Sequence, residues 1–198
     1  IEYSINYSHG SLISRIRNNE TYKFLNSDCD YLLFIDSDVF NFENYMVKVL
    51  QDMVLYNYKV IGLSYPLKQF DNNLLMYNIN NRLPLFDTCT NFNINFVNNL
   101  TEDKNGHLPT GCLIIDRIVF YELAVAKIVK SYTENDKTIF NYFDCRIYKD
   151  KYLSEDYSFC EYCHEMGIKN YCLVNAKLSH IGYFNYTGKL KDLIKKII

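Results

Sequence analysis

The chain has 198 residues, of which 48% are hydrophobic and 22% are charged, and its formal net charge is −2. These values are typical of one globular domain and exclude a disordered or fibrous protein. The charge is near neutral and no dense lysine or arginine run occurs, which argues against a nucleic-acid partner. No apolar run approaches the roughly 18 residues of a transmembrane segment. We therefore expect a single domain over residues 1–198, without a membrane span.

The first third of the chain alternates between strand and helix patterns. Strands are predicted at Tyr3–Tyr7, Tyr31–Ile35 and Lys59–Leu63, and helices at Ser11–Asn26 (with Ser11 as N-cap) and Glu43–Tyr56. The run Tyr31–Ile35 is continuously apolar, which is typical of a strand buried on both faces of a parallel sheet. This alternation predicts an α/β domain with right-handed crossovers.

The rest of the chain is less regular. Leu74–Ile79 and Asn91–Val97 alternate loosely and are interpreted as antiparallel strands, and Asn98–His107 as a loop. Further strands are predicted at Cys112–Ile115 and Tyr171–Val174. Helices are predicted at Ile118–Val129, Ser154–Met166 and Leu190–Ile198. Gly167 is the expected C-cap of the second of these helices, and the third is basic and amphipathic.

Seven cysteines, an odd number without framework spacing, indicate reduced thiols and a cytosolic compartment. The bias toward Asn, Tyr, Ile and Lys suggests an A/T-rich genome, as in some large DNA viruses and protists. For a viral protein the compartment would be the host cytoplasm, and a secretory lumen is the alternative. The segment Cys160–His164 reads C-x-x-C-H, a haem or zinc pattern, but no second C-x-x-C accompanies it. We interpret Phe159, Cys160 and Cys163 as the buried face of a helix.

The segment YLLFIDSDVF, from Tyr31, runs an apolar strand directly into Asp36 and Asp38. Side chains alternate along extended backbone, so both carboxylates can point to one side of the strand end. Carboxyl ends of strands form the ligand crevice of open parallel sheets. Two carboxylates repel each other unless a cation lies between them, and Mg²⁺ or Mn²⁺ suits oxygen ligands and often brings phosphate oxygens. The alternative is a solvated turn with an Asp N-cap.

Five other segments carry polar residues able to gather near this pair. They are RIRN from Arg15, YPLK from Tyr65, PTG from Pro109, SEDYSFC from Ser154 and HIGYFNYTG from His180. With FIDSD from Phe34, their order and spacing resemble the nucleotide-sugar glycosyltransferases of the GT-A fold, near family 2, and within it a bacterial and viral subset. The resemblance extends from about Ser11 to Leu190.

The resemblance implies a Rossmann-like, open, mostly parallel sheet flanked by helices, with a small antiparallel addition. The first strand of that fold has no counterpart here, so we expect the domain to be N-terminally truncated. The resemblance also implies that Asp36, Asp38 and His180 bind Mn²⁺ or Mg²⁺ at the donor's diphosphate, with Asp36 on the ribose or on a metal-bound water.

Further roles follow from the same resemblance. The nucleotide-sugar contacts that it implies come from Arg15, Arg17, Asn18, Lys68, Thr110, Gly111 and Lys189. Two arginines two positions apart on a helix cannot both face the site, and Arg17 is the favoured one. Glu155 and Asp156 lie where the fold places its general base, and Asp156 is implied as the base of an inverting reaction. The alternative is that both simply form the acidic first turn of a helix.

The predicted function is therefore metal-dependent transfer of a hexosyl-type sugar from a nucleoside-diphosphate donor, most often UDP, to a hydroxyl of a glycan or protein acceptor. One alternative is a haloacid-dehalogenase-type phosphohydrolase, because Asp36–Val39 fits D-x-D-x-[TV]. Asp36 would then be the nucleophile, Asp38 the acid/base, and Glu155 and Asp156 metal carboxylates. That motif normally closes the first strand, which argues against it. The other alternative is a catalytically inactive transferase-like binding domain.

Overall fold

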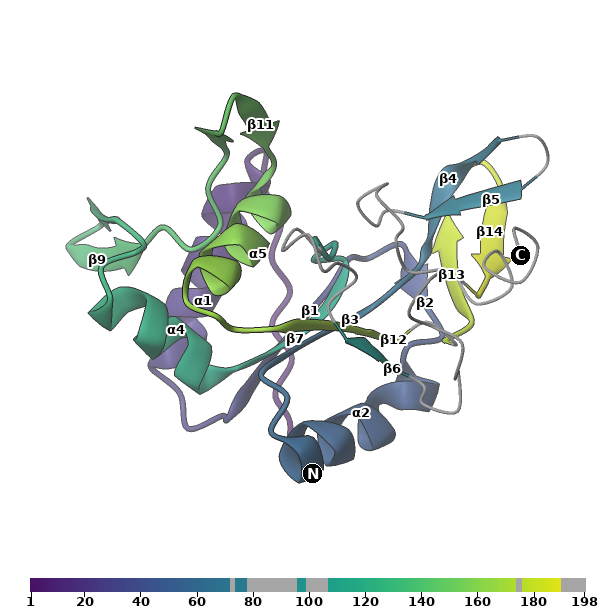
Figure 1. Cartoon of the computed structure of the whole chain (residues 1–198), viewed down its shortest axis with the longest axis horizontal. Coiled ribbons are helices and arrows are strands. Elements are labelled where there is room, and N and C mark those ends of the chain that lie inside the picture. Colours follow the sequence, from purple (N-terminus) through teal and green to yellow (C-terminus); the bar gives the residue numbers. More distant parts are fainter. Residues whose placement is uncertain (72–73, 78–95, 99–106, 174–175, 190–198) are drawn as a thin grey trace.

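The computed structural model describes residues 1–71, 74–77, 96–98, 107–173 and 176–189 (Figure 1). Within these residues the helices are α1 (Ile13–Leu25), α2 (Glu43–Tyr56), α4 (Arg117–Val125) and α5 (Glu155–Glu165). A central sheet contains, in spatial order, β1 (Tyr31–Ile35), β7 (Cys112–Asp116), β3 (Val60–Leu63), β12 (Asn170–Leu173) and β6 (Phe96–Asn98).

The central sheet is mixed. Strand β7 pairs antiparallel with both β1 and β3, β12 pairs parallel with β3, and β6 pairs antiparallel with β12. Strands β1, β3 and β12 therefore share one direction, and α2 connects β1 to β3. The predicted α/β class is confirmed, but the prediction of a mostly parallel sheet is wrong for the described strands. A continuous apolar run indicates burial and does not reveal that β7 enters between β1 and β3 in the opposite direction.

The remaining described strands form small antiparallel sheets. One is three-stranded, in the order β14 (Asn185–Gly188), β13 (Leu178–Ile181) and β2 (Val39–Phe40). The others are the hairpins β4–β5 (Pro66–Asp71 and Leu74–Tyr77), β8–β9 (Ser131–Glu134 and Lys137–Phe140) and β10–β11 (Arg146–Tyr148 and Lys151–Leu153). The predicted small antiparallel addition is thus present.

Two of these hairpins turn on pairs of residues with positive φ. Asn135 and Asp136 have φ of 49° and 60°, and Lys149 and Asp150 have φ of 48° and 61°. Two successive left-handed residues give the turn whose twist matches antiparallel strands, and Asn and Asp tolerate it best. No strands were predicted in this region, although the pair Asn135-Asp136 is typical of a hairpin turn and could have indicated β8 and β9.

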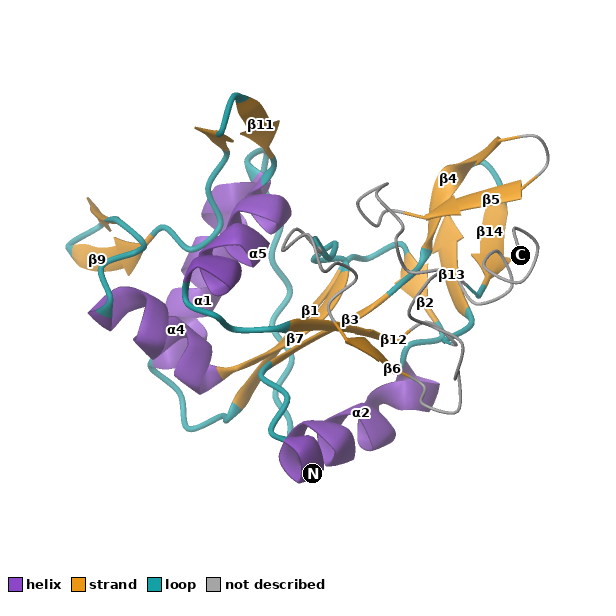
Figure 2. Cartoon of the chain, viewed as in Figure 1, coloured by secondary structure: helices purple, strands orange, loops and turns teal. Residues whose placement is uncertain are grey.

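Both faces of the sheet are covered, as Figure 2 shows: α1, α4 and α5 lie on one side and α2 lies on the other. Successive side chains of β7 serve the two layers alternately. Leu113 and Ile115 pack in a cluster with residues of α1, α4 and α5, whereas Cys112 and Ile114 pack in a cluster with Val49 and Met53 of α2. This strand is almost completely buried, so it is the centre of the core.

Several predicted elements coincide with the structure. The predicted bounds are confirmed for Tyr31–Ile35 and Glu43–Tyr56. The other matching elements differ from prediction only at their ends; they are the helices α1, α4 and α5 and the strands β3, β7 and β12. Gly167 follows α5 with φ of 70°, as a C-terminal glycine should. The antiparallel predictions near β5 and β6 are confirmed in their described parts. Residues 78–95 and 99–106, and the predicted helix Leu190–Ile198, lie outside the described residues.

Other local predictions are wrong. Tyr3–Tyr7 forms no strand, and Tyr3 and Tyr7 are 81% and 93% exposed, because no neighbouring strand pairs with their backbone. Ser11 does not cap α1; the N-cap position is Leu12, without a side-chain hydrogen bond. Strand β1 is only partly buried, since among the described strands it pairs with β7 alone.

Two observations concern membrane and thiol chemistry. No helix in the described ranges is both long enough and apolar enough to cross a bilayer. The cysteines in these ranges are unpaired thiols, and Cys112, Cys160, Cys163 and Cys172 are buried. Burial raises the pKa of Cys112 and of Cys172, each to about 12, so both stay protonated at neutral pH.

We expect Leu113→Ala to lower the free energy of unfolding by about 2–5 kcal/mol, because it opens a cavity in the fully buried strand β7. Urea denaturation monitored by circular dichroism measures this value. Leu55→Ala on α2 is the matched control, since Leu55 is 71% exposed, and its change should stay within about 0.5 kcal/mol. Equal effects of the two substitutions would contradict the assigned core.

Candidate functional site

The candidate site begins where β1 ends and β7 starts. Because these strands are antiparallel neighbours, residues that follow β1 meet residues that precede β7, and the backbone N–H of Asp36 donates to the carbonyl of Gly111 at 3.0 Å. A Cβ on Gly111 would lie 2.1 Å from the hydroxyl oxygen of Tyr65 and 2.8 Å from Oδ2 of Asp36. Only glycine fits at this position, so the P-T-G segment makes room for two polar groups of the site.

Arg17 joins the strand end to α5. Its side chain is 6% exposed, its Nη2 lies 3.2 Å from Oδ1 of Asp36, and its Nε lies 3.5 Å from Oε1 of Glu155. The guanidinium also lies over the Phe34 ring, 5.3 Å from the ring centroid. Two carboxylates from segments far apart in sequence are thus held by one buried cation, which agrees with the preference for Arg17 over Arg15.

Asp38 points to a different set of partners. A turn after Asp36, closed by the hydrogen bond from Val39 N to Asp36 O at 3.0 Å, leads into β2, which pairs with β13. The Asp38 carbonyl accepts a hydrogen bond from Ile181 N, and its carboxylate lies 2.5 Å from Nζ of Lys68. The D-x-D pair is therefore divided, because Asp36 pairs with Arg17 and Asp38 with Lys68.

His180 faces Asp38 in a fixed ring orientation. Its Nδ1 lies 2.8 Å from the carbonyl oxygen of Pro66, and its Nε2 lies 3.5 Å from Oδ1 of Asp38. A carbonyl can only accept, so Nδ1 carries the hydrogen and Nε2 presents its lone pair to the carboxylate unless the ring is charged. Two electron-rich atoms at this distance favour a proton or a metal cation between them.

The charges around Asp38 favour its ionised form. Partial burial raises the pKa of Asp38, but the hydrogen bond from Lys68 and the nearby charges of His180 and Lys68 outweigh it, so the pKa of Asp38 lies below its ordinary value. Lys68 reaches this position because Gly182 has no side chain: a Cβ there would lie 2.9 Å from Cδ of Lys68. Asp38 is therefore an ionised carboxylate at neutral pH.

Tyr65 connects the two halves of the site. It is 5% exposed, its ring lies edge-on to His180 with centroids 5.0 Å apart, and its hydroxyl adjoins Gly111. Burial, together with the charges of Asp36 and Asp156, raises the pKa of Tyr65 far above its ordinary value. Tyr65 is thus a permanent hydroxyl. Tyr65 begins the YPLK segment, but no role was predicted for it. Its position shortly after a buried strand was the sequence feature that could have indicated one.

The first turn of α5 supplies two carboxylates. Burial, followed by the charge of Asp156, raises the pKa of Glu155, and Arg17 acts in the opposite direction without cancelling the rise. Asp156 is 8% exposed, and its Oδ1 accepts hydrogen bonds from the Ser154 hydroxyl and from Tyr157 N. Ser154, not an acidic residue, occupies the N-cap position. The acidic pair therefore faces the interior beside Arg17 and Tyr65, and is not merely a solvated helix start.

Three predicted site residues lie elsewhere. Arg15 points outward and lies 3.4 Å from Glu134. Asn18 is buried and bonds to Asn141 and to both backbone groups of Phe143, so it fastens α1 to that segment. Lys189 follows β14 at the end of the hairpin where Gly188 pairs with Leu178. His180 lies further along the same hairpin, where it pairs with Tyr186. A fourth predicted residue, Thr110, is next to Gly111 in the chain and is buried, with 1% of its surface exposed. Within the described residues, no hydrogen bond or ion pair joins Arg15, Asn18 or Lys189 to the carboxylates of the site.

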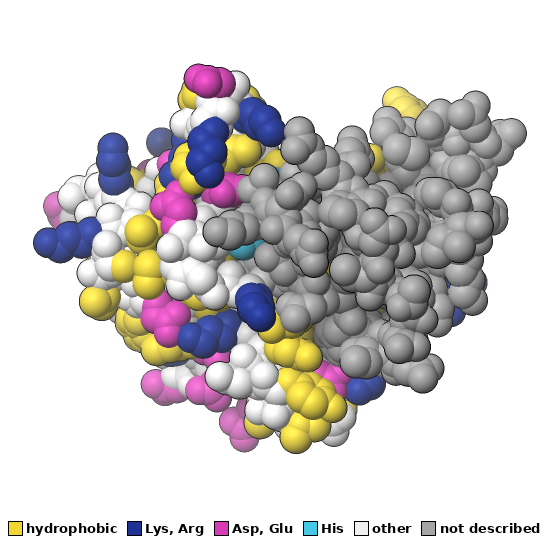
Figure 3. All heavy atoms as spheres, viewed as in Figure 1, with side chains coloured by type: hydrophobic (Ala, Val, Ile, Leu, Met, Phe, Trp, Pro, Cys, Tyr) yellow, Lys and Arg dark blue, Asp and Glu magenta, His cyan; other side chains and the backbone are white. Residues whose placement is uncertain are grey.

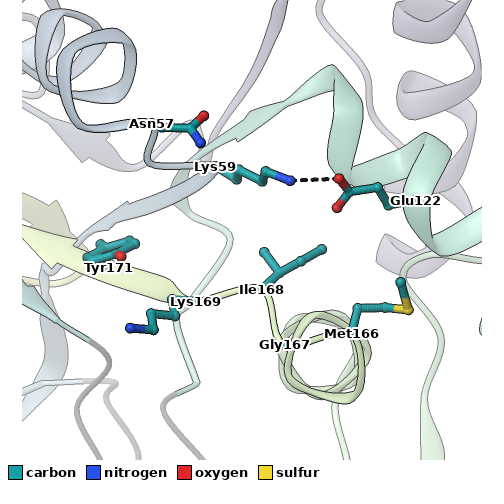
Figure 4. Close-up of a pocket in the computed structure, with 8 residues that line it drawn as sticks. All are labelled: Asn57, Lys59, Glu122, Met166, Gly167, Ile168, Lys169 and Tyr171. Carbon is teal, nitrogen blue, oxygen red and sulfur yellow. Dashed lines mark hydrogen bonds and ion pairs between the residues drawn. The ribbon is translucent and has the colours of Figure 1, made fainter.

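A cavity among the described residues lies at the other end of the sheet (Figure 4). Its volume is about 570 Å³, and Lys59 and Lys169, which precede β3 and β12, help to line it. The ion pair between Lys59 and Glu122, 2.6 Å apart, crosses its wall. It shares no residue with the carboxylate site. On the face shown in Figure 3, acidic and basic side chains of the described residues are interspersed.

Comparison with protein families finds no match for this chain, and comparison with curated proteins finds none either. Among solved structures, the chain is similar to the crystal structure of A197 from STIV. The two sequences are 19% identical, the TM-score is 0.48, and the alignment covers 90% of this chain and 72% of that chain. A likeness at this level establishes neither a family nor a function.

We expect Arg17→Gln to raise the pKa of Glu155 further, because the substitution removes the cation that favours its charged form. The side-chain carboxyl ¹³C shift of Glu155, followed over a pH titration, measures the change. Arg15→Gln is the matched control two positions away, and it should leave that titration unchanged. An unshifted Glu155 in Arg17→Gln would show that the two groups are not coupled.

Proposed function

We propose that the chain is a metal-dependent glycosyltransferase of the GT-A type, which binds a nucleoside-diphosphate sugar at the end of β1. The observation that carries the proposal is the arrangement of His180: its Nδ1–H is directed to Pro66 O, and its Nε2 faces the ionised carboxylate of Asp38 at 3.5 Å. A histidine oriented in this way by a backbone carbonyl is the usual form of a metal-binding imidazole.

The donor set fits Mn²⁺ or Mg²⁺. One carboxylate and one oriented imidazole leave room for water and phosphate oxygens, and the nitrogen ligand favours Mn²⁺ of the two. Asp36 is drawn to Arg17, so Asp38 and His180 are the residues that would hold the cation. When bound, the cation neutralises charge on the departing nucleoside diphosphate.

The protein's own residues add to this neutralisation. Lys68 Nζ lies against Asp38, with its side chain 39% exposed, so a diphosphate at this place would meet an ammonium as well as the cation. Arg17 is too deeply buried and too fully engaged with Asp36 and Glu155 to reach solvent, and its role is to position these carboxylates. Because Gly111 has no side chain, its backbone lies close to Tyr65 and Asp36.

Asp156 is the group placed to accept a proton from the acceptor hydroxyl. It lies at the start of α5, near Tyr65, where the Ser154 hydroxyl and Tyr157 N hold its Oδ1 in place and leave Oδ2 for the incoming proton. Its neighbour Glu155 is bound to Arg17 and has a raised pKa, so Glu155 supports the site rather than serving as the base. Attack on the face opposite the leaving group would invert the anomeric carbon.

The geometry favours the transferase over the phosphohydrolase. A haloacid-dehalogenase-type reaction needs Asp36 and Asp38 together, the first as nucleophile and the second as acid/base. Arg17 and Lys68 instead draw these two carboxylates to separate partners. An inactive binding domain would keep the same nucleotide contacts, so turnover, not binding, distinguishes it.

We expect one of UDP, GDP and dTDP to bind in calorimetric titrations with Mn²⁺ and to bind at least tenfold more weakly without it. Asp38→Asn and His180→Ala should each weaken Mn²⁺-dependent binding at least tenfold, which is about 1.4 kcal/mol. Asp136→Asn, in the exposed β8–β9 turn, is the control and should bind as the parent does. Binding that ignores both Mn²⁺ and His180→Ala would refute the metal assignment.

We expect Asp156→Asn to lower the rate of sugar transfer about 10²–10⁴-fold while the affinity for the nucleotide stays the same, because only proton acceptance is removed. Release of free nucleoside diphosphate from sugar nucleotides, with water as a slow acceptor, measures turnover before the acceptor is known. If the parent protein binds nucleotide but releases none with any donor, the domain is a binding module. Undiminished turnover in Asp156→Asn would assign the base elsewhere.

A further inference from the structure

A second cluster of side chains of the types that bind metals involves the later turns of α5. His107, Glu161 and His164 each offer one ligand atom, and these atoms lie within 4.8 Å of one another. Nε2 of His107 is 2.7 Å from Oε1 of Glu161, and both residues are about 5% exposed. Among the described residues this is the one group of three or more His, Cys, Asp or Glu side chains at such distances.

The His164 ring supplies an independent sign that a ligand belongs here. Its Nδ1 is buried and has no hydrogen-bond partner, whereas its Nε2 lies 3.2 Å from the side-chain amide of Asn170. A buried ring nitrogen without a partner is costly, and a bound ion removes that cost. The Asn170 amide can turn to accept from Nε2–H, which is the contact that a metal-binding histidine normally makes through its other nitrogen.

The neighbouring cysteines are directed differently. Cys160 and Cys163 are completely buried in the core between α5 and the sheet, and burial raises the pKa of both thiols. Within the C-x-x-C-H segment, Glu161 and His164 therefore turn toward the cluster, whereas the two cysteines do not. A cavity of about 210 Å³, lined by His107 and Glu161 and by side chains of the β10–β11 hairpin, adjoins the two ligands and leaves space for a water.

We propose that His107, Glu161 and His164 form a binding site for a divalent zinc-type cation, separate from the site at Asp38 and His180. Two imidazoles and one carboxylate, with a water from the cavity as the fourth ligand, match the tetrahedral preference of Zn²⁺ better than the oxygen-rich octahedron of Mg²⁺. Ligand atoms around tetrahedral Zn²⁺ lie about 3.3 Å apart. The cation therefore replaces the 2.7 Å hydrogen bond between His107 and Glu161 after a small side-chain shift.

The test is a titration of the chelator-treated full chain with Zn²⁺ alone, followed by calorimetry, with Co²⁺ as the spectroscopic probe. We expect one tight Zn²⁺ site, a melting temperature about 5–10 °C higher at a hundredfold excess over Kd, and a tetrahedral Co²⁺ spectrum without a thiolate charge-transfer band. His164→Asn and Glu161→Gln should weaken Zn²⁺ binding at least 100-fold, and Asn170→Ala about 10–100-fold.

The chain has four histidines, so matched controls are available. His9→Asn, at an exposed position, and His180→Asn, at the other candidate site, should leave the Zn²⁺ affinity unchanged. The proposal is overturned if the parent protein binds no Zn²⁺, if His180→Asn abolishes the binding, or if Co²⁺ shows a thiolate band, which would assign the metal to cysteines. The Co²⁺ spectrum of the parent decides the ligand type even if a substituted chain fails to fold.

Discussion

The buried guanidinium of Arg17 is the interaction on which the candidate site depends. A charge with a side chain only 6% exposed needs partners of opposite sign, and Asp36 and Glu155 supply them from the end of β1 and the start of α5. Without that cation, the carboxylates of Glu155 and Asp156 would share a poorly solvated region with Asp36. Arg17 thus fixes the distance between the strand that carries the D-x-D segment and the helix that carries the proposed base.

The same interaction explains why the two aspartates differ in role. Asp36 is bound by Arg17 and by its backbone hydrogen bond to Gly111, although its side chain is 39% exposed. Asp38 follows the turn and remains 38% exposed, and its partners Lys68 and His180 come from the small antiparallel sheets. The two aspartates therefore differ in their partners rather than in their exposure. In the proposed function, the D-x-D spacing separates a carboxylate bound to Arg17 from one that would bind the cation together with His180.

Sequence patterns predicted the features that depend on residues close together in the chain. The apolar run of Tyr31–Ile35 and the helical period of Glu43–Tyr56 gave those bounds without correction, because burial and periodicity are local properties. The direction of β7 was not predictable in the same way, since it depends on which distant strands pair with it. Helix geometry indicated that only one of Arg15 and Arg17 can face the site, and Arg17 was the favoured one. It did not show that Asn18 bonds to Phe143, 125 positions away.

The cluster of His107, Glu161 and His164 was not predicted, for the same reason. Glu161 and His164 lie three positions apart inside the C-x-x-C-H segment, but His107 lies 54 positions before Glu161, and no local pattern connects it to them. The cluster and the candidate active site nevertheless use the same two segments. His107 lies four positions before Gly111, and His164 lies about 12 Å along α5 from Asp156. A cation bound there would clamp the P-T-G segment to α5 and so restrict how Gly111 and Asp156 move relative to each other. The second proposed site would then support the first through backbone position rather than through contact with substrate.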